Sequence, residues 1–144
     1  MKRISKPPFP TLEKFFCGLC FVLSLFGCGG SGEEVKEIER LREEGLRTAA
    51  LTNNWATGDP GPNPLRPHFD EFVESAVEGL QKPDPRIYEL VLARLGVTAD
   101  QSVFLDDIGR NLKAAREMGM TTIKVDDPAT ALAALEDHIG FSLT

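Results

Sequence analysis

The stretch Val-Phe-Leu-Asp-Asp-Ile-Gly-Arg-Asn-Leu, residues 103–112, decides the fold class of this chain. Its first three residues are apolar and the next two are acidic, a pattern typical of a buried strand that ends in polar groups. Gly109 lies in the following turn, and residues 111–118 have helical spacing and are closed by Gly119. Because a buried strand followed by a helix is the repeating unit of parallel sheets, this stretch predicts an α/β protein. In such proteins the functional groups gather at the carboxyl ends of the strands.

Alternating helices and strands extend this unit along the chain. The predicted helices cover residues 33–44, 85–95, 111–118 and 128–139, and the predicted strands cover residues 47–52, 69–75, 102–105 and 121–125. Residues 55–67 are rich in proline and glycine, which predicts a loop. The helix at 85–95 has the clearest end signals, with Asp84 as its N-cap, Pro85 at its first position and Gly96 beyond its end. The alternation predicts a Rossmann-like parallel sheet with helices on both faces.

The composition is that of one ordinary globular domain. The chain has 144 residues, of which 42% are hydrophobic and 26% are charged, and this length supports a single core. Its 16 basic and 22 acidic side chains give a formal net charge of −6. Because nucleic-acid-binding domains present a basic face, the acidic excess argues against nucleic acid as a partner.

The first 32 residues are open to three interpretations. They hold all three cysteines and the uncharged run FFCGLCFVLSLF at residues 15–26. Basic residues precede the run and Cys28 follows it, so membrane attachment through residues 15–28, as a signal peptide or lipoprotein anchor, is one interpretation. A buried strand over residues 19–26 is the second, and a misassigned or alternative start is the third. We expect a cytoplasmic protein, with export or lipid anchoring as the alternative.

Polar side chains stand where the predicted strands end or the predicted helices begin. In chain order these candidates are Thr52, Asn53, Lys82, Asp106, Asp107 and Asn111. Alone, each has a simpler explanation as a turn, a solvated side chain or a helix cap, but together they occur in a consistent order. Adjacent carboxylates repel each other unless a cation offsets them, and Mg²⁺ is a natural choice because it takes oxygen ligands. A hydroxyl, a lysine and a metal ion would neutralise a phosphoryl group from several sides. The pattern therefore predicts a site for a small phosphorylated or anionic molecule.

The order threonine, lysine, acidic pair resembles that of the haloacid dehalogenase superfamily. Three segments look like its second, third and fourth motifs: RTAALTNNW at residues 47–55, KPDPRIY at 82–88 and VFLDDIGRNL at 103–112. They are similar to the phosphatase domains of soluble epoxide hydrolases and of acyl-CoA dehydrogenase family members. The resemblance runs from about residue 33 to residue 144 and implies a phosphatase-type hydrolase.

The resemblance also implies a role for each candidate residue. Thr52 and Lys82 would be catalytic, and the phosphate would be held by these two with Asn53 and Asn111. Asp107 would bind Mg²⁺, with Asp106 as a second metal residue. We expect the metal to be held weakly, because the ligands of the family's first motif are missing.

That first motif, Asp-x-Asp, does not occur in this chain. In the family its first carboxylate is the nucleophile, and a cap domain normally follows it. We therefore expect an incomplete core, with residues 1–32 as a hydrophobic leader or substitute central strand and residues 33–144 as the C-terminal part of the hydrolase. If residues 19–26 form the central strand, Gly27 and Cys28 stand where the nucleophile would be. Catalysis is then impaired or absent, and the alternative is a non-catalytic domain, membrane-tethered or not, that binds an anion or a partner.

Overall fold

A parallel sheet organises the part of the chain that the structure, a computed structural model, describes: residues 20–23, 32–53 and 64–144. Its strands are β1 (Cys20–Leu23), β2 (Arg47–Thr52), β3 (Glu71–Glu74), β4 (Ser102–Asp106) and β5 (Thr121–Lys124). They lie in the order β3-β2-β1-β4-β5, and every neighbouring pair is parallel. The prediction of an α/β fold with a Rossmann-like parallel sheet is confirmed.

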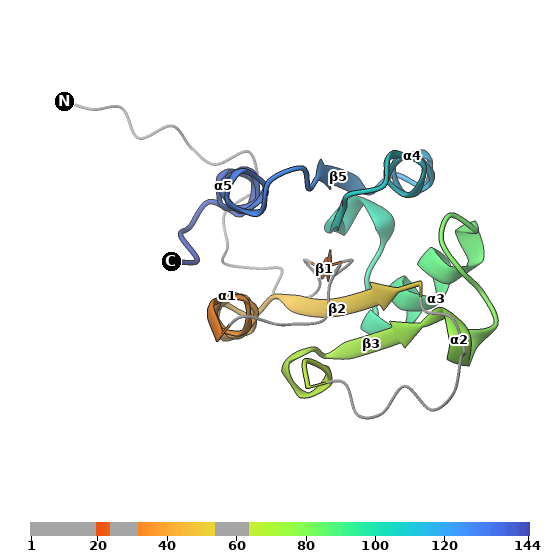
Figure 1. The fold of residues 1–144 in the computed structure, drawn as a ribbon, viewed down its shortest axis with the longest axis horizontal. Helices are drawn as coiled ribbons and strands as arrows, with labels where there is room; N and C mark the ends of the chain where they lie inside the picture. Colours follow the sequence, from red (N-terminus) through yellow and green to blue (C-terminus); the bar gives the residue numbers. More distant parts are fainter. Residues whose placement is uncertain (1–19, 24–31, 54–63) are drawn as a thin grey trace.

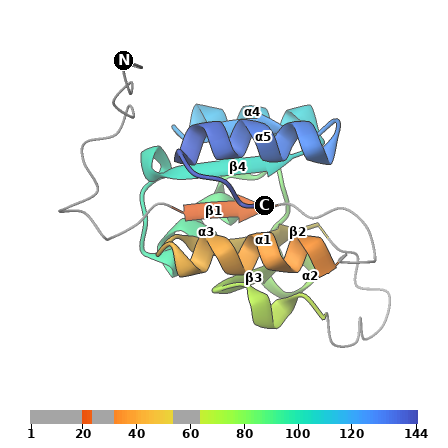
Figure 2. The same cartoon turned by 90° about the vertical axis from the view of Figure 1, so that its left-hand side faces the viewer.

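β1 occupies the centre of this sheet, between β2 and β4 (Figure 2). In the register, Leu23 lies opposite Ala50 of β2 and Leu105 of β4. Without β1, the facing edges of β2 and β4 would leave buried backbone groups unpaired, at a cost of about 1–3 kcal/mol each. The strand predicted over residues 19–26 is present over Cys20–Leu23. The remainder of that segment, with Gly27 and Cys28, lies outside the described residues.

Helices cover both faces of the sheet (Figure 1). They are α1 (Gly32–Glu43), α2 (Ser75–Glu78), α3 (Pro85–Leu95), α4 (Gly109–Glu117) and α5 (Pro128–Ile139), with short 3₁₀ turns at residues 66–68 and 99–101. α1 and α5 lie on one face, and α3 and α4 lie on the other. Within the described residues, no helix combines the length and the apolar character needed to cross a membrane.

The strands divide their side chains between two apolar layers, as the pleat of a sheet requires. Phe104 of β4 packs with α3 and α4, whereas its neighbours Val103 and Leu105 pack with Leu41 of α1 and Leu135 of α5. Because side chains two apart on a strand share a face, the end of β4 directs its next polar side chain, that of residue 106, toward α3 and α4.

The element boundaries agree with the predictions where local signals are strong. β2, α3 and α5 have the predicted bounds, and Gly96 ends α3 with a left-handed φ of 69°. The predicted strand at 69–75 is shorter, because the chain turns into α2 at Ser75. The helix predicted from residue 111 begins at Gly109, after a turn in which the Asp106 carboxylate accepts a hydrogen bond from the Ile108 backbone N–H.

Candidate active site

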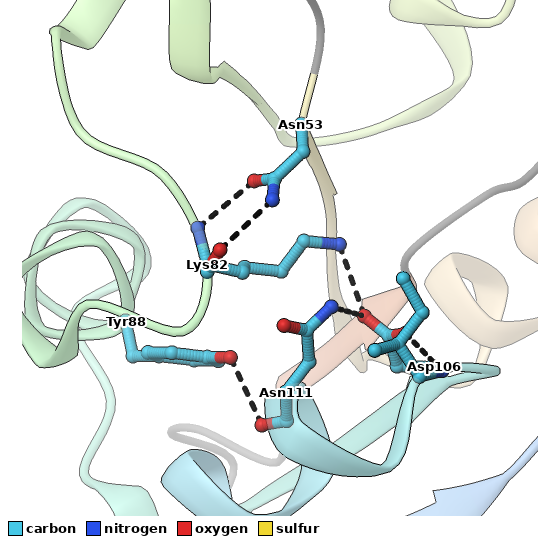
Figure 3. Close-up of polar contacts among 6 residues, drawn as sticks. Asn53, Lys82, Tyr88, Asp106 and Asn111 are labelled. Atoms are coloured by element: carbon cyan, nitrogen blue, oxygen red, sulfur yellow. Dashed lines mark hydrogen bonds and ion pairs between the residues drawn. The ribbon is translucent and has the colours of Figure 1, made fainter.

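A buried ion pair between Lys82 and Asp106 lies at the carboxyl end of the sheet (Figure 3). Lys82 Nζ donates to Asp106 Oδ2 over 3.0 Å, and the side chains are only 3% and 1% exposed. Asp106 is the last residue of β4, whereas Lys82 belongs to the turn that precedes α3. A buried charge of this kind is tolerated only when it is paired and hydrogen-bonded, so the two residues depend on each other.

The Asp106 carboxylate accepts hydrogen bonds on both oxygens. Oδ1 accepts from the Ile108 backbone N–H at 2.7 Å, and Oδ2 accepts from Asn111 Nδ2 at 3.1 Å as well as from Lys82. Burial alone would raise the pKa of this carboxyl, but the Ile108 hydrogen bond and the Lys82 charge lower it below its ordinary value. Asp106 is therefore ionised and serves as the anchor for the lysine.

The pKa of Lys82 is lowered by burial, while the Asp106 carboxylate and the charge of Asp107 oppose the shift. The ammonium also lies over the face of the Phe104 ring, 5.8 Å from its centroid. A poorly solvated ammonium of this kind has a strong electrostatic effect on any anion that reaches it. The structure thus places a buried cation, paired with Asp106, at the end of β4.

Asn53 holds the backbone of Lys82 rather than presenting its amide to a ligand. Its Oδ1 accepts from the Lys82 backbone N–H and its Nδ2 donates to the Lys82 carbonyl, both at 2.9 Å (Figure 3). This pair of bonds ties the residue after β2 to the turn before α3. The sequence predicted that Asn53 helps to hold a phosphate, but its side-chain amide is committed to the backbone of Lys82.

Asn111, in the first turn of α4, is buried. Its Nδ2 donates to Asp106, which orients the amide and leaves Oδ1 as a buried acceptor that finds no hydrogen-bond partner among the described residues. The Tyr88 hydroxyl donates to the Asn111 backbone carbonyl at 2.9 Å. Tyr88 and Ile108 were not among the predicted site residues, although both stand inside the quoted motifs.

The structure brings four of the six predicted site residues into one hydrogen-bonded group: Asn53, Lys82, Asp106 and Asn111. The other two stand at its border. Thr52 is half-buried at the end of β2, and Asp107 is exposed after the end of β4. Neither side chain makes a hydrogen bond or ion pair within the described part of the chain.

Among the predicted site residues, the carboxylate that a hydrated magnesium ion would need is that of Asp107. Mg²⁺ often keeps several waters and is held through one or two carboxylates together with a substrate phosphate. Asp107 supplies one such exposed carboxylate, whereas the oxygens of Asp106 already accept hydrogen bonds. Among residues 20–23, 32–53 and 64–144, no three His, Cys, Asp or Glu side chains form a metal-binding cluster.

Residues 33–119 match the haloacid dehalogenase-like hydrolase family, a match that covers more than half of the chain. The lysine–carboxylate pair at the carboxyl end of a parallel sheet agrees with the motifs through which the sequence resembled that family. The chain therefore belongs to the haloacid dehalogenase-like hydrolases.

Relatives of known name share this region. Acyl-CoA dehydrogenase family member 10 of Mus musculus is 48% identical over 108 residues, covering 74% of this chain and 10% of that protein. Bifunctional epoxide hydrolase 2 of Sus scrofa is 44% identical over 110 residues, covering 72% of this chain and 20% of that protein. Sesquiterpene phosphatase astK of Aspergillus oryzae is 35% identical, covering 72% of this chain and 54% of that protein. The chain thus spans about a tenth to a fifth of the length of the first two relatives.

Solved structures agree on the fold. An uncharacterized protein from Corynebacterium glutamicum aligns with a TM-score of 0.75 at 19% identity, covering 85% of this chain and 96% of that one. A haloacid dehalogenase family enzyme from Bacteroides thetaiotaomicron, solved with magnesium and inorganic phosphate, aligns with a TM-score of 0.58 at 21% identity. That alignment covers 69% of this chain and 56% of the other.

Proposed function

We propose that this chain is a phosphatase-type hydrolase that binds a phosphate group and Mg²⁺ but turns substrate over slowly or not at all by itself. The observation that carries the proposal is the Lys82–Asp106 pair, buried at the carboxyl end of the sheet and braced by Asn53 and Asn111. Two similarities support it: one relative is a sesquiterpene phosphatase, and one fold neighbour was solved with magnesium and inorganic phosphate.

Each polar group has a part in this proposal. The Lys82 ammonium offsets negative charge on the phosphate, while the Thr52 hydroxyl and the Asn53 backbone N–H donate to its oxygens. Asp107 contributes the carboxylate that holds the hydrated metal ion, which supplies positive charge to the phosphoryl group when bound. Preorganised donors of this kind act strongly because they need no rearrangement when the anion arrives.

Asn111 has an indirect part. Its Nδ2 is committed to Asp106, and the atom that remains, Oδ1, is an acceptor. An unprotonated phosphate oxygen has no proton to donate to such an atom. We therefore assign Asn111 to holding Asp106, and through it Lys82, rather than to direct phosphate contact.

The missing step is nucleophilic attack. The acidic residues nearest in sequence to β1 are Glu13 and Glu33, so no carboxylate closely follows this central strand. Covalent catalysis that has lost its nucleophile loses nearly all of its rate, although binding and electrostatic stabilisation survive. The absence of a carboxylate just after β1 in the sequence also supports the alternative function, that of a non-catalytic domain that binds an anion.

Two measurements test the proposal. Binding of inorganic phosphate in the presence of Mg²⁺, followed by calorimetry, is expected for the wild-type chain and is expected to weaken in Asp107→Asn. Hydrolysis of p-nitrophenyl phosphate is expected near background. Absence of phosphate binding would overturn the proposed site, and rapid Mg²⁺-dependent hydrolysis that Asp107→Asn abolishes would overturn the proposed impairment.

A further inference from the structure

Tyr88 is fully buried in α3 and contacts Asn111 of the site and Phe104 beside it, without being one of the residues that would contact phosphate. Its hydroxyl donates to the Asn111 backbone carbonyl at 2.9 Å. Its ring packs edge-on against Phe104, with 5.3 Å between centroids and 80° between the planes. Figure 3 shows the phenol reaching from α3 to the first turn of α4. Tyr88 thus joins two helices on the same face of the sheet.

Both contacts of Tyr88 lead to the Lys82 ammonium. One path runs through Asn111, whose Nδ2 donates to the same Asp106 oxygen that accepts from Lys82 Nζ. The other runs through the Phe104 ring, which packs against the Tyr88 ring and has the ammonium over its face. A displacement of the phenol would therefore disturb the lysine from two sides.

The hydroxyl acts as a donor in this contact. Burial and the nearby Asp106 charge raise the pKa of Tyr88 far above its ordinary value, so the phenol keeps its proton. The backbone carbonyl of Asn111 can only accept. The direction of the bond is therefore defined, and a phenylalanine would fill the same space without making it.

We propose that Tyr88 is a positioning residue for the phosphate site: its hydroxyl holds the first turn of α4 so that Asn111 meets Asp106 and Asp106 holds Lys82. This inference rests on the proposed function, because it assigns Tyr88 to a phosphate site. The hydrogen bonds that link Tyr88 through Asn111 and Asp106 to Lys82 are nevertheless present without any ligand. The simpler explanation is that Tyr88 is a core side chain whose hydroxyl only needs a hydrogen-bond partner in the interior and has no effect on the site.

The test compares Tyr88→Phe with the matched variant Ser102→Ala. Ser102 is also buried and also donates its hydroxyl to a backbone carbonyl, that of Ala99 at 2.7 Å, but it lies at the opposite end of β4. Each variant removes one buried hydroxyl, so a comparable fall in Tm is expected from both.

Hydrogen exchange of the Asn111 side-chain amide, measured by NMR in the ligand-free protein, is the first readout. It is expected to accelerate by about threefold to tenfold in Tyr88→Phe, the range that corresponds to one hydrogen bond, and to stay unchanged in Ser102→Ala. The second readout is the Kd for inorganic phosphate with Mg²⁺, which is expected to rise by a similar factor in Tyr88→Phe alone.

Equal behaviour of the two variants in the exchange measurement would overturn the inference, even if Tyr88→Phe lowers the Tm. Faster exchange with an unchanged phosphate Kd would also overturn it, because the hydroxyl would then stabilise a contact that the site does not use. If the wild-type chain binds no phosphate, the proposed function fails. The exchange measurement then decides by itself whether Tyr88 positions Asn111.

Discussion

Asp106 is the residue on which the contacts of the site converge. It accepts from a lysine, an asparagine and a backbone N–H while it is removed from solvent. A buried carboxylate with this number of donors stays ionised, and its charge in turn keeps a buried ammonium in place. The acidic pair thus has divided roles: Asp106 organises protein groups, and the exposed Asp107 faces solvent.

Loss of the lysine is expected to be costly. Lys82→Met leaves Asp106 buried without its counter-charge, which typically destabilises a protein by about 3–5 kcal/mol. Lys124→Met is the control, because the Lys124 side chain is 53% exposed beside Asp126 and such surface pairs contribute about 0–1 kcal/mol. Urea unfolding of both variants measures the difference. Equal losses would contradict the buried ion pair.

Magnesium binding is expected to depend on Asp107. With one available carboxylate among the site residues, the wild-type chain is expected to bind Mg²⁺ with millimolar rather than micromolar affinity. Asp107→Asn is expected to abolish the binding heat in calorimetry without lowering stability, because the side chain is exposed. Asp137→Asn, an exposed change on α5, is the control and is expected to behave as wild type. Identical heats for all three proteins would show that Asp107 is not a ligand.

At the scale of the elements, the first turn of α3 keeps Lys82 close to β4. Asp84 caps this helix by accepting from the Arg86 backbone N–H at 3.0 Å, and the Arg86 guanidinium bonds the same carboxylate. Pro85 occupies the first helical position, where a missing N–H is harmless. The turn that carries Lys82 is therefore held at one end by Asn53 and at the other by the cap of α3.

The hydrogen bonds of this helix cap are expected to affect the pKa of Asp84. The side-chain hydrogen bonds from Arg86, followed by its backbone N–H, lower the pKa of Asp84 from 3.8 to about 2. In Arg86→Gln the guanidinium is gone but the backbone N–H stays, so the pKa is expected to rise part of the way toward 3.8. Because the folded-state pKa is lowered, ionised Asp84 favours the folded state above pH 3.8, and this contribution is lost as the pH falls toward 2.

Carbon-13 NMR of the Asp84 carboxyl carbon measures this pKa directly. Arg94→Gln is the control, since Arg94 pairs with Glu78 at the other end of α3 and its removal is expected to leave Asp84 unchanged. An Asp84 pKa near 2 in Arg86→Gln would mean that the guanidinium does not contribute.

At the scale of the whole molecule, the central strand joins two halves of the site. β2 carries Thr52 and Asn53 at its end, β4 carries Asp106, and β1 hydrogen-bonds to both strands. The carboxyl ends of parallel strands share one edge of the sheet, which is where ligands bind in open α/β folds. The separation of the two halves is therefore set by β1.

Proline in this strand is expected to unfold the protein. Val22 lies opposite Ala49 and Phe104 in the two neighbouring strands. Proline at such a position removes a ladder hydrogen bond, and it is confined in proteins to edge strands, strand starts and bulges. Val22→Pro is expected to abolish the cooperative thermal transition followed by circular dichroism. Val22→Ile keeps the backbone N–H and is expected to melt as wild type. A normal transition in Val22→Pro would show that the sheet does not need β1.

The elements that the sequence predicted with correct bounds are those with local signals. β2 has Ala49, Ala50 and Leu51 at its centre. α3 and α5 begin at a proline after an aspartate and end before a glycine. These signals act through the conformational limits of single residues and through hydrogen bonds to near neighbours, so they can be read from a few consecutive letters. The three motifs likewise identified the family, because their residue types and order are properties of the chain alone.

The sequence by itself thus determined the fold class, the family and the set of polar residues at the strand ends. The tertiary structure decided which of them touch. In the fold, the Asn53 amide hydrogen-bonds to the backbone of Lys82, and the Tyr88 hydroxyl hydrogen-bonds to Asn111. Asp106 is buried, whereas its neighbour Asp107 is exposed. The tertiary structure also placed residues 20–23 at the centre of the sheet as β1. These outcomes depend on contacts between segments far apart in the chain, where the pairing of buried backbone and polar groups, rather than local preference, decides the arrangement.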